Sequence, residues 1–213
     1  MKDLTARLFK LFGGTIGASF CIASILHSNL GAFATTACNI SFSNWFPFLT
    51  VGMVGFLIEL MIMLILIYLK EGIGLAGIVN MTIGSICIDI FNTILPYSPL
   101  MVLTLPLLGV FWCWVAQSEF GETNLNLLTT AIMKKTGKSI SVIRTIQECS
   151  FLAIGLLNSN CVTWFTIVLS LFLGKMLGII YKMMKFNPTE IEHKYIIRAK
   201  TVGGGQYEIS KKM

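Results

Sequence analysis

The sequence predicts an all-α polytopic membrane protein with six transmembrane helices, arranged as two inverted repeats of three. The first observation is composition, because 55% of the 213 residues are hydrophobic and only 12% are charged, whereas soluble domains carry about 25% charged residues. The second is that the apolar residues gather in long segments, and roughly 20 such residues cross a bilayer as a helix. The third is a correspondence between the two halves of the chain at an offset of about 90 residues.

The first half begins with a short basic segment, residues 1–10, followed by a predicted span over residues 11–28. Gly13 and Gly17 stand four residues apart in this span, a spacing that lets helices approach closely. The next segment, residues 30–46, is uncharged, but it is too short and too rich in Asn and Ser to cross. We expect a re-entrant or interfacial helix there, because irregular backbone at membrane depth is tolerated where protein buries it or where it lines a cavity.

Each of the next two predicted spans carries one carboxylate. Residues 47–69 contain Glu59 near the middle, and residues 72–95 contain Asp89. An acid inside a membrane helix costs about 2.5–3.5 kcal/mol on insertion scales, so each acid is a functional-site hypothesis. At helical spacing, one face of the third span carries a polar stripe: Thr82, Ser85, Asp89 and Asn92. We expect this stripe to face protein or a water-filled cavity rather than lipid.

The second half of the chain repeats this order of segments. We predict a fourth span at residues 100–117, followed by a short polar and basic segment at 118–138. A fifth span at 140–157 and a sixth at 161–181 come next. The fifth span contains Arg144 and Glu148, and the sixth contains Lys175. Residues 182–213 form a polar tail that we expect to lie in the cytoplasm.

The basic residues predict the orientation of the chain. With the N-terminus inside, 15 of the 16 lysines and arginines fall on the cytoplasmic side, counting Arg144 at the inner edge of the fifth span, and the three outside loops hold none. This asymmetry is the positive-inside pattern of multi-pass membrane proteins. We therefore expect both termini in the cytoplasm and the bilayer as the main partner of the chain.

The internal correspondence predicts two repeats, residues 11–95 and residues 100–181. Glu59 matches Glu148 at an offset of 89, and the segment Leu30-Gly31-Ala32 matches Phe120-Gly121-Glu122. Because each half would cross the membrane an odd number of times, the second half would be inverted relative to the first. In such folds the substrate site lies near the midplane between the repeats, where helices are broken.

Two stretches resemble a known family. These are Thr136–Glu148, with the pattern T-G-K-S-I-S-x-x-R-x-x-x-E, and the Asn80–Asp89 stretch of the third span. Together they are similar to the YczE/YitT-type bacterial integral membrane proteins, over most of residues 8–183. The resemblance implies a multi-pass protein of the bacterial cytoplasmic (inner) membrane, and it supplies architecture more than activity. The family often has Pro and an acid soon after each Leu-Gly, where this chain has residues 32–36 and 122–126 without that pattern. If those positions line a substrate site, the ligand of this member differs or the site has decayed.

The candidate site is built from membrane-embedded polar residues. For substrate binding or proton coupling the candidates are Asp89, Glu59, Glu148, Thr82, Ser85, Asn92, Asn80 and His27. Asp89 is the first candidate for a functional role. The alternative is a structural role, in which its carboxylate holds an Asn or Thr of a neighbouring helix in place. Arg144 and Glu148 stand at i,i+4 and are predicted to form a structural ion pair. The alternative for Glu148 is that it and Glu59 are symmetry-related acceptors of a proton or cation.

Several classes of function are disfavoured. The basic residues lie between and after apolar spans rather than in a stripe with exposed aromatics, so no nucleic-acid partner is expected. The sequence has no Walker loop, metal-ligand cluster or nucleophile–base pair, so we expect neither an enzyme nor a cofactor or metal.

The leading hypothesis is a secondary transporter for a small cationic or polar solute, with proton coupling as one variant. A first alternative is a substrate-binding membrane subunit that works with separate ATPase partners. A second is a membrane scaffold or regulator that transports nothing. The sequence leaves open a homodimer.

Overall fold

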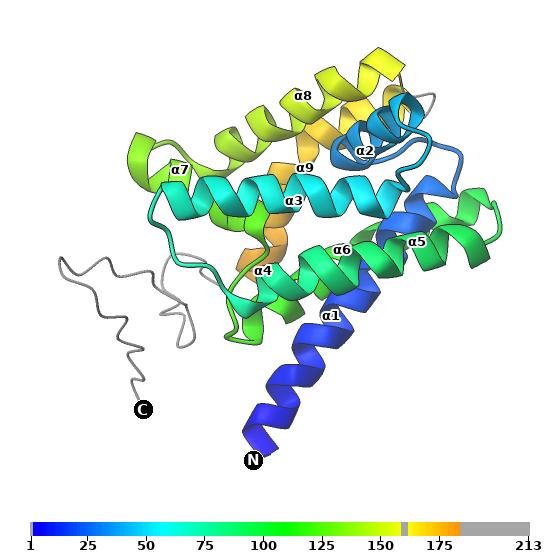
Figure 1. Cartoon of the computed structure of the whole chain (residues 1–213). Coiled ribbons are helices and arrows are strands. Elements are labelled where there is room, and N and C mark those ends of the chain that lie inside the picture. The colour runs from blue at the N-terminus through cyan, green and yellow to red at the C-terminus, as the bar shows by residue number, and fades with distance from the viewer. Residues whose placement is uncertain (1, 159–161, 184–213) are drawn as a thin grey trace.

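A computed structural model describes residues 2–158 and 162–183 of the chain, which form helices joined by short loops (Figure 1). In order the elements are α1 (Lys2–Leu26), α2 (Ala34–Trp45), α3 (Val51–Tyr68), α4 (Leu75–Val79), the π-helix η1 (Asn80–Gly84), α5 (Ser85–Ile94), the 3₁₀-helix η2 (Pro99–Thr104), α6 (Leu105–Gln117), α7 (Asn124–Thr136), α8 (Ile140–Asn158) and α9 (Trp164–Met183). The all-helical prediction is therefore confirmed for the described residues.

Four segments in the described part of the chain are long and apolar enough to cross a membrane: Leu4–Leu26, Val51–Tyr68, Leu75–Ile94 and Pro99–Gln117. They correspond to the first four predicted spans, and they make this a multi-pass membrane protein in contact with the lipid bilayer. The fifth and sixth predicted spans correspond to α8 and α9, which are not among these four. The side chain of Lys175 and residues 184–213 of the tail predicted at 182–213 lie outside the described residues.

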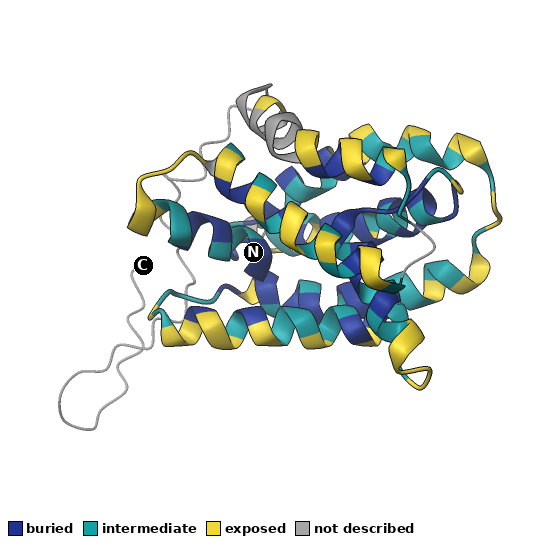
Figure 2. Ribbon diagram, turned by 90° about the horizontal axis from the view of Figure 1, so that it is seen from above, coloured by how far each residue is buried: buried dark blue, intermediate teal, exposed yellow. Residues whose placement is uncertain are grey.

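The outer faces of the helices are apolar. Figure 2 shows exposed residues along the outward sides of the helices and buried ones where the helices meet. Helix α3, for example, exposes six large apolar side chains: Met53, Leu57, Met61, Leu64, Ile65 and Ile67. A contiguous apolar surface of this kind marks an interaction site or a membrane-facing surface, and on a helix that can span a membrane it is the lipid-facing side.

The core forms where α1 packs along α6. One cluster joins Cys21 and Ile25 of α1 to Leu108 of α6, all of them fully buried. The spacing of small residues in α1 serves this contact, because a Cβ atom on Gly17 would lie 2.4 Å from the ring of Phe111. Figure 1 shows α1 running into the centre of the bundle from an N-terminal end that projects beyond the other helices.

The short segments of the two halves form short helices. Helix α2 has 12 residues and α7 has 13, so at 1.5 Å per residue each is about 18–20 Å long, less than the hydrocarbon thickness of about 30 Å. Helix α2 packs against α8 and α3, and α7 packs against α3 and α8. Both short helices therefore lie against the bundle rather than apart from it.

The turns that lead into α2 and α7 have the same backbone design. Asn29 and Gly31 have φ of 58° and 141°, and at an offset of 90 residues Glu119 and Gly121 have φ of 61° and 100°. In each turn a serine hydroxyl donates to a carbonyl three residues earlier at 2.6 Å and accepts from the amide two residues later. Glycine is required at 31 and 121, because an L side chain rarely adopts such a positive φ.

Each of these turns holds the beginning of a helix from the other half of the chain. The amide of Ala32 donates to the Thr166 hydroxyl in the first turn of α9 at 3.2 Å. In the other half, the amide of Ala76 in α4 donates to the carbonyl of Phe120 at 3.2 Å. The two helix beginnings correspond at the offset of 90 residues, Thr166 to Ala76, and each contacts the turn that contains the matching glycine, Gly31 or Gly121.

The third span contains a local irregularity that its sequence pattern does not reveal. Residues Asn80–Gly84 form a π-helical turn between α4 and α5. A π-turn widens the helix and turns its side chains, and such turns are often found at functional sites. It brings Asn80 and Ser85 to the wall of a cavity.

Candidate functional site

A cavity of about 120 Å³ lies between the helices of the two halves. Its wall includes one acid, Glu59 of α3, and one base, Arg144 of α8. It also includes three carboxamides, Asn39 of α2, Asn80 of η1 and Asn126 of α7. The two short helices thus deliver one asparagine each, and the π-turn delivers the third.

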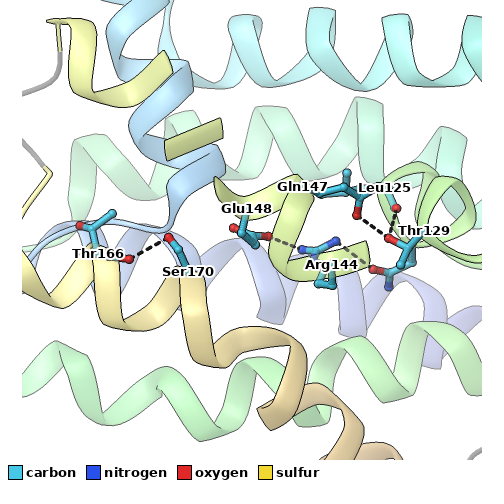
Figure 3. Close-up of polar contacts among 8 residues, drawn as sticks. Leu125, Thr129, Arg144, Gln147, Glu148, Thr166 and Ser170 are labelled. Atoms are coloured by element: carbon cyan, nitrogen blue, oxygen red, sulfur yellow. Dashed lines mark hydrogen bonds and ion pairs between the residues drawn. The ribbon is translucent and has the colours of Figure 1, made fainter. Parts of the chain in front are cut away.

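A buried ion pair between Arg144 and Glu148 lies at the cavity. Figure 3 shows Arg144 pointing toward Glu148, and its Nη2 lies 2.9 Å from Glu148 Oε1. The Arg144 side chain is 6% exposed and that of Glu148 is 1% exposed. Arg144 Nη1 also donates to Asn126 Oδ1 at 3.4 Å, which ties α8 to α7. Removing one member of such a pair costs several kcal/mol, because an uncompensated charge stays buried.

Glu59 lies beside this pair. The positive charge of Arg144 acts on the Glu59 carboxyl group, and the Asn124 side chain also interacts with it. One carboxylate oxygen of Glu59, Oε2, is buried with no hydrogen-bond partner among the described residues, and the same holds for Arg144 Nε. Glu59, Arg144 and Glu148 form one cluster, which carries two acids and one base.

Helix α7 is fixed to α8 by a second polar contact. The hydroxyl of Thr129 lies 2.6 Å from Gln147 Oε1 and 2.9 Å from the carbonyl of Leu125, as Figure 3 shows. Asn124, at the start of α7, is fully buried and places its amide nitrogen 3.4 Å from the carbonyl of Gly77. These contacts set the position of the α7 side chains that reach the cavity.

Asp89, the leading candidate from the sequence, does not line the cavity. Its Oδ2 accepts a hydrogen bond from the Thr50 hydroxyl at 2.5 Å, and its Oδ1 accepts one from the amide of Gly52 at 2.7 Å. Thr50 is the N-cap of α3 and also accepts from the amide of Met53 at 3.1 Å. These hydrogen bonds are those of the alternative stated for Asp89, in which its carboxylate holds a threonine of a neighbouring helix.

The other candidate residues of the third span fall into two groups, those that line the cavity and those that do not. Ser85 and Asn80 line the cavity, whereas Thr82 and Asn92 do not. Thr82 turns back to its own helix and donates to the carbonyl of Ile78 at 2.8 Å. Asn92 lies toward the end of α5, and its buried Oδ1 has no partner among the described residues. The π-turn changes the helical spacing on which the stripe was predicted.

His27 lies away from the cavity, at the end of α1. Its ring stacks on Tyr97 with centroids 4.4 Å apart and an interplanar angle of 19°. Its carbonyl accepts a hydrogen bond from the amide of Ser98 at 3.0 Å. In this structure His27 joins α1 to the turn before η2.

Glu122 is a buried acid that the list of candidate residues omits. It lies in the turn before α7, outside the four candidate spans, and is 4% exposed. Burial raises the pKa of Glu122 to about 7, and the positive charge of Lys134 opposes this rise. Lys134 Nζ itself lies 3.6 Å from Glu71 Oε2. The next residue, Thr123, lines the cavity.

The candidates from the sequence omit asparagines of both short segments: Asn39 and Asn126, which line the cavity, and Asn124, whose side chain interacts with Glu59. Their signal was present, since both segments are rich in Asn, but the choice of candidates followed charges in the spans. Among the described residues no group of three or more His, Cys, Asp or Glu side chains could hold a metal ion.

Comparison with known proteins places the chain in a family without giving it an activity. Residues 5–182 match DUF6198, a family of unknown function. No curated protein and no solved structure matches the chain. The match does not establish the resemblance to the YczE/YitT-type proteins, which stays an expectation. Because the match covers most of its length, the chain belongs to the DUF6198 family of unknown function.

Proposed function

We propose that this protein is a secondary transporter that carries a small cationic or polar solute across the bacterial cytoplasmic membrane. The observation that carries the proposal is the cavity between the two halves, walled by Glu59, Arg144 and three carboxamides. Polar and ionisable groups are costly inside a membrane protein, and where they persist they commonly mark the path of a solute or ion. A cavity of this kind within a multi-pass bundle is what a solute carrier requires.

The proposal includes six transmembrane helices in two inverted repeats, residues 11–95 and 100–181, with both termini in the cytoplasm. Its support is the pair of equivalent turns before α2 and α7 and the equivalent contacts they make with α9 and α4. In transporters with inverted repeats, one repeat rocks against the other around a fixed central site. Here the central site is the cavity, and the two short helices form part of its wall.

The proposal is tested by binding and then by transport. A panel of small polar solutes is screened for those that raise the melting temperature of the purified protein, because a ligand that binds the folded state stabilises it. Each solute that binds is then offered to proteoliposomes, with and without a pH gradient. We expect accumulation that depends on the protein and that Glu59→Gln reduces, whereas Glu71→Gln, in the turn between α3 and α4 and outside the cavity, leaves it unchanged.

The outcome that overturns the proposal is binding without transport. If a solute stabilises the protein but does not accumulate in vesicles under any gradient, the protein is not a secondary transporter. A stable complex with ATPase subunits on purification would then identify it as the substrate-binding subunit of a driven importer. Binding with neither transport nor such partners would identify a membrane regulator.

A further inference from the structure

The charge balance around the cavity is uneven. Arg144 is paired with Glu148 at 2.9 Å, and Glu59 faces the same arginine without an ion pair of its own among the described residues. With both acids ionised, the three side chains carry one net negative charge. A bound cation would bring this cluster to neutrality, a zwitterion would leave the charge as it is, and an anion would double it. Because charges interact strongly where water is excluded, this difference discriminates between ligands.

We propose that the cavity recognises a small organic cation of the ammonium type, with Glu59 as its counter-ion. This inference rests on the proposed transport function and names the substrate class of that same site. Arg144 then has a positioning role, because its pairing with Glu148 holds α8 in place and leaves Glu59 as the one surplus carboxylate of the cluster.

The remaining polar wall suits a ligand that donates hydrogen bonds. Asn39, Asn80 and Ser85 line the cavity, and each of these side chains has an oxygen that can accept a hydrogen bond. The side-chain oxygen of Asn126 already accepts one from Arg144 Nη1 at 3.4 Å. An ammonium group has several N–H donors and no acceptor, so it can use a carboxylate and neutral oxygens together. A carboxylate ligand would be repelled by Glu59. The one base that lines the cavity, Arg144, already contacts the Glu148 carboxylate and the side-chain oxygen of Asn126.

The apolar part of the wall supports the same class of ligand. Three aromatic side chains line the cavity, Phe33, Trp112 and Phe151. The negative faces of aromatic rings attract organic cations, and Trp is the strongest of them. A cation with a short carbon chain can therefore be held by Glu59 at its charged end and by aromatic side chains along its apolar part.

The size of the cavity limits the ligand. A cavity of 150 Å³ holds benzene, so about 120 Å³ accommodates roughly five non-hydrogen atoms. A bare metal ion would leave most of that space unfilled, because oxygen ligands must approach it to about 2–2.6 Å. The site is therefore matched to an organic ion of a few atoms rather than to a metal ion or to a large quaternary amine.

The test compares four probes of similar size and different charge on the whole purified protein at pH 7. They are ethanolammonium as the cation, glycine as the zwitterion, glycolate as the anion and acetamide as the neutral compound. Affinity is measured by calorimetry and by the shift of melting temperature. We expect ethanolammonium to bind most tightly, with glycine and acetamide weaker and glycolate not bound. Tetraethylammonium, a larger cation, should not bind.

The variants separate a contact from a general effect of charge. Glu59→Gln keeps the size of the side chain and should weaken ethanolammonium binding by roughly tenfold to a hundredfold, the value of a hydrogen bond to a charged group. Glu148→Gln leaves Arg144 without its acid, so Glu59 is no longer the surplus carboxylate and ethanolammonium binding should weaken there too. Glu71→Gln is the matched control. The melting temperature of each variant without ligand shows whether it is folded.

The outcomes distinguish this inference from the proposed function. Tighter binding of glycine or glycolate than of ethanolammonium overturns the cation assignment and leaves a transporter of another solute. Equal binding of ethanolammonium by the wild type and by folded Glu59→Gln overturns the role of Glu59. If none of the four probes binds, the inference is wrong. Selective binding of ethanolammonium that Glu59→Gln abolishes, without uptake into vesicles, supports the site and overturns transport.

Discussion

Glu122 combines burial with an incomplete set of hydrogen bonds. Its side chain lies in the turn before α7, and its Oε1 is buried with no partner among the residues that the structure describes. The charged group that acts on it is Lys134 of α7, which is shared with Glu71 from the turn before α4. Burial disfavours the ionised form of a carboxyl group, and the pKa of Glu122 rises to about 7 as a result.

This pKa predicts how stability depends on pH. Because the folded-state pKa is raised from 4.5 to about 7, the folded protein binds more protons than the unfolded chain between these values. Folding stability therefore falls as pH rises through this window. In Glu122→Gln that loss is absent, so the variant should match the wild type near pH 4.5 and exceed it above pH 7, by at most about 3 kcal/mol. Thermal unfolding in detergent from pH 4.5 to 8 measures the difference. A difference that stays constant over this range contradicts the prediction.

At the level of one element, the beginning of α3 depends on a residue of α5. The first amides of a helix have no partner within the helix, and here the carboxylate of Asp89 accepts from the Gly52 amide and from the Thr50 hydroxyl. A negative charge at this end also interacts favourably with the helix dipole. The contact holds two of the candidate spans together.

Asp89→Ala should destabilise the protein by about 1–3 kcal/mol, because it removes a cap and leaves donors without partners. Asp89→Asn keeps one acceptor oxygen and should cost less. Neither change should alter the affinity of the cavity for its ligand, since Asp89 does not line it. Unfolding measurements and calorimetry on the same samples test both parts. A large loss of affinity in folded Asp89→Asn would show that Asp89 belongs to the site after all.

A pair of glycine variants provides the control for this contact. A Cβ atom on Gly52 would lie 2.3 Å from the carbonyl oxygen of Ser85 and 2.6 Å from the carboxyl group of Asp89. A Cβ atom on Gly13 of α1 would meet nothing within 4 Å. Gly52→Ala should therefore destabilise the protein by separating α3 from α5. Gly13→Ala should be neutral or slightly stabilising, because alanine favours a helix by up to about 1 kcal/mol.

Glu59 and Asp89 show how much of the fold and of the candidate site could be predicted from the sequence. The four apolar spans and both short segments follow from length, hydropathy and charge, which are local properties. Glu59 could be selected for the same reason, as an acid within an apolar span. The partner of Asp89 could not be identified, because Thr50 is 39 residues away and only the packing of α3 on α5 brings them together. The π-turn at Asn80–Gly84 could not be predicted either, since it changes the helical period that the pattern assumes.

At the scale of the whole molecule, the two halves are joined at two equivalent junctions. Residues 28–32 contact the beginning of α9, and residues 118–122 contact the beginning of α4. In the proposed arrangement of inverted repeats, the first junction lies on the outer side of the membrane and the second on the inner side. If one repeat rocks against the other, the outer junction must open in one state and the inner junction in the other.

Cross-linking either junction should therefore stop transport. In a background without the native cysteines, Ala32→Cys is combined with Thr166→Cys at the outer junction, where the Ala32 amide lies 3.2 Å from the Thr166 hydroxyl. Ala76→Cys with Phe120→Cys serves the inner junction, where the backbone contact is also 3.2 Å. We expect oxidation of either pair to abolish uptake into proteoliposomes and a reductant to restore it. Ser43→Cys with Leu49→Cys, a contact within the turn between α2 and α3, should have no such effect. If uptake continues with both junctions closed, the halves do not move relative to each other at these points and the rocking mechanism is wrong.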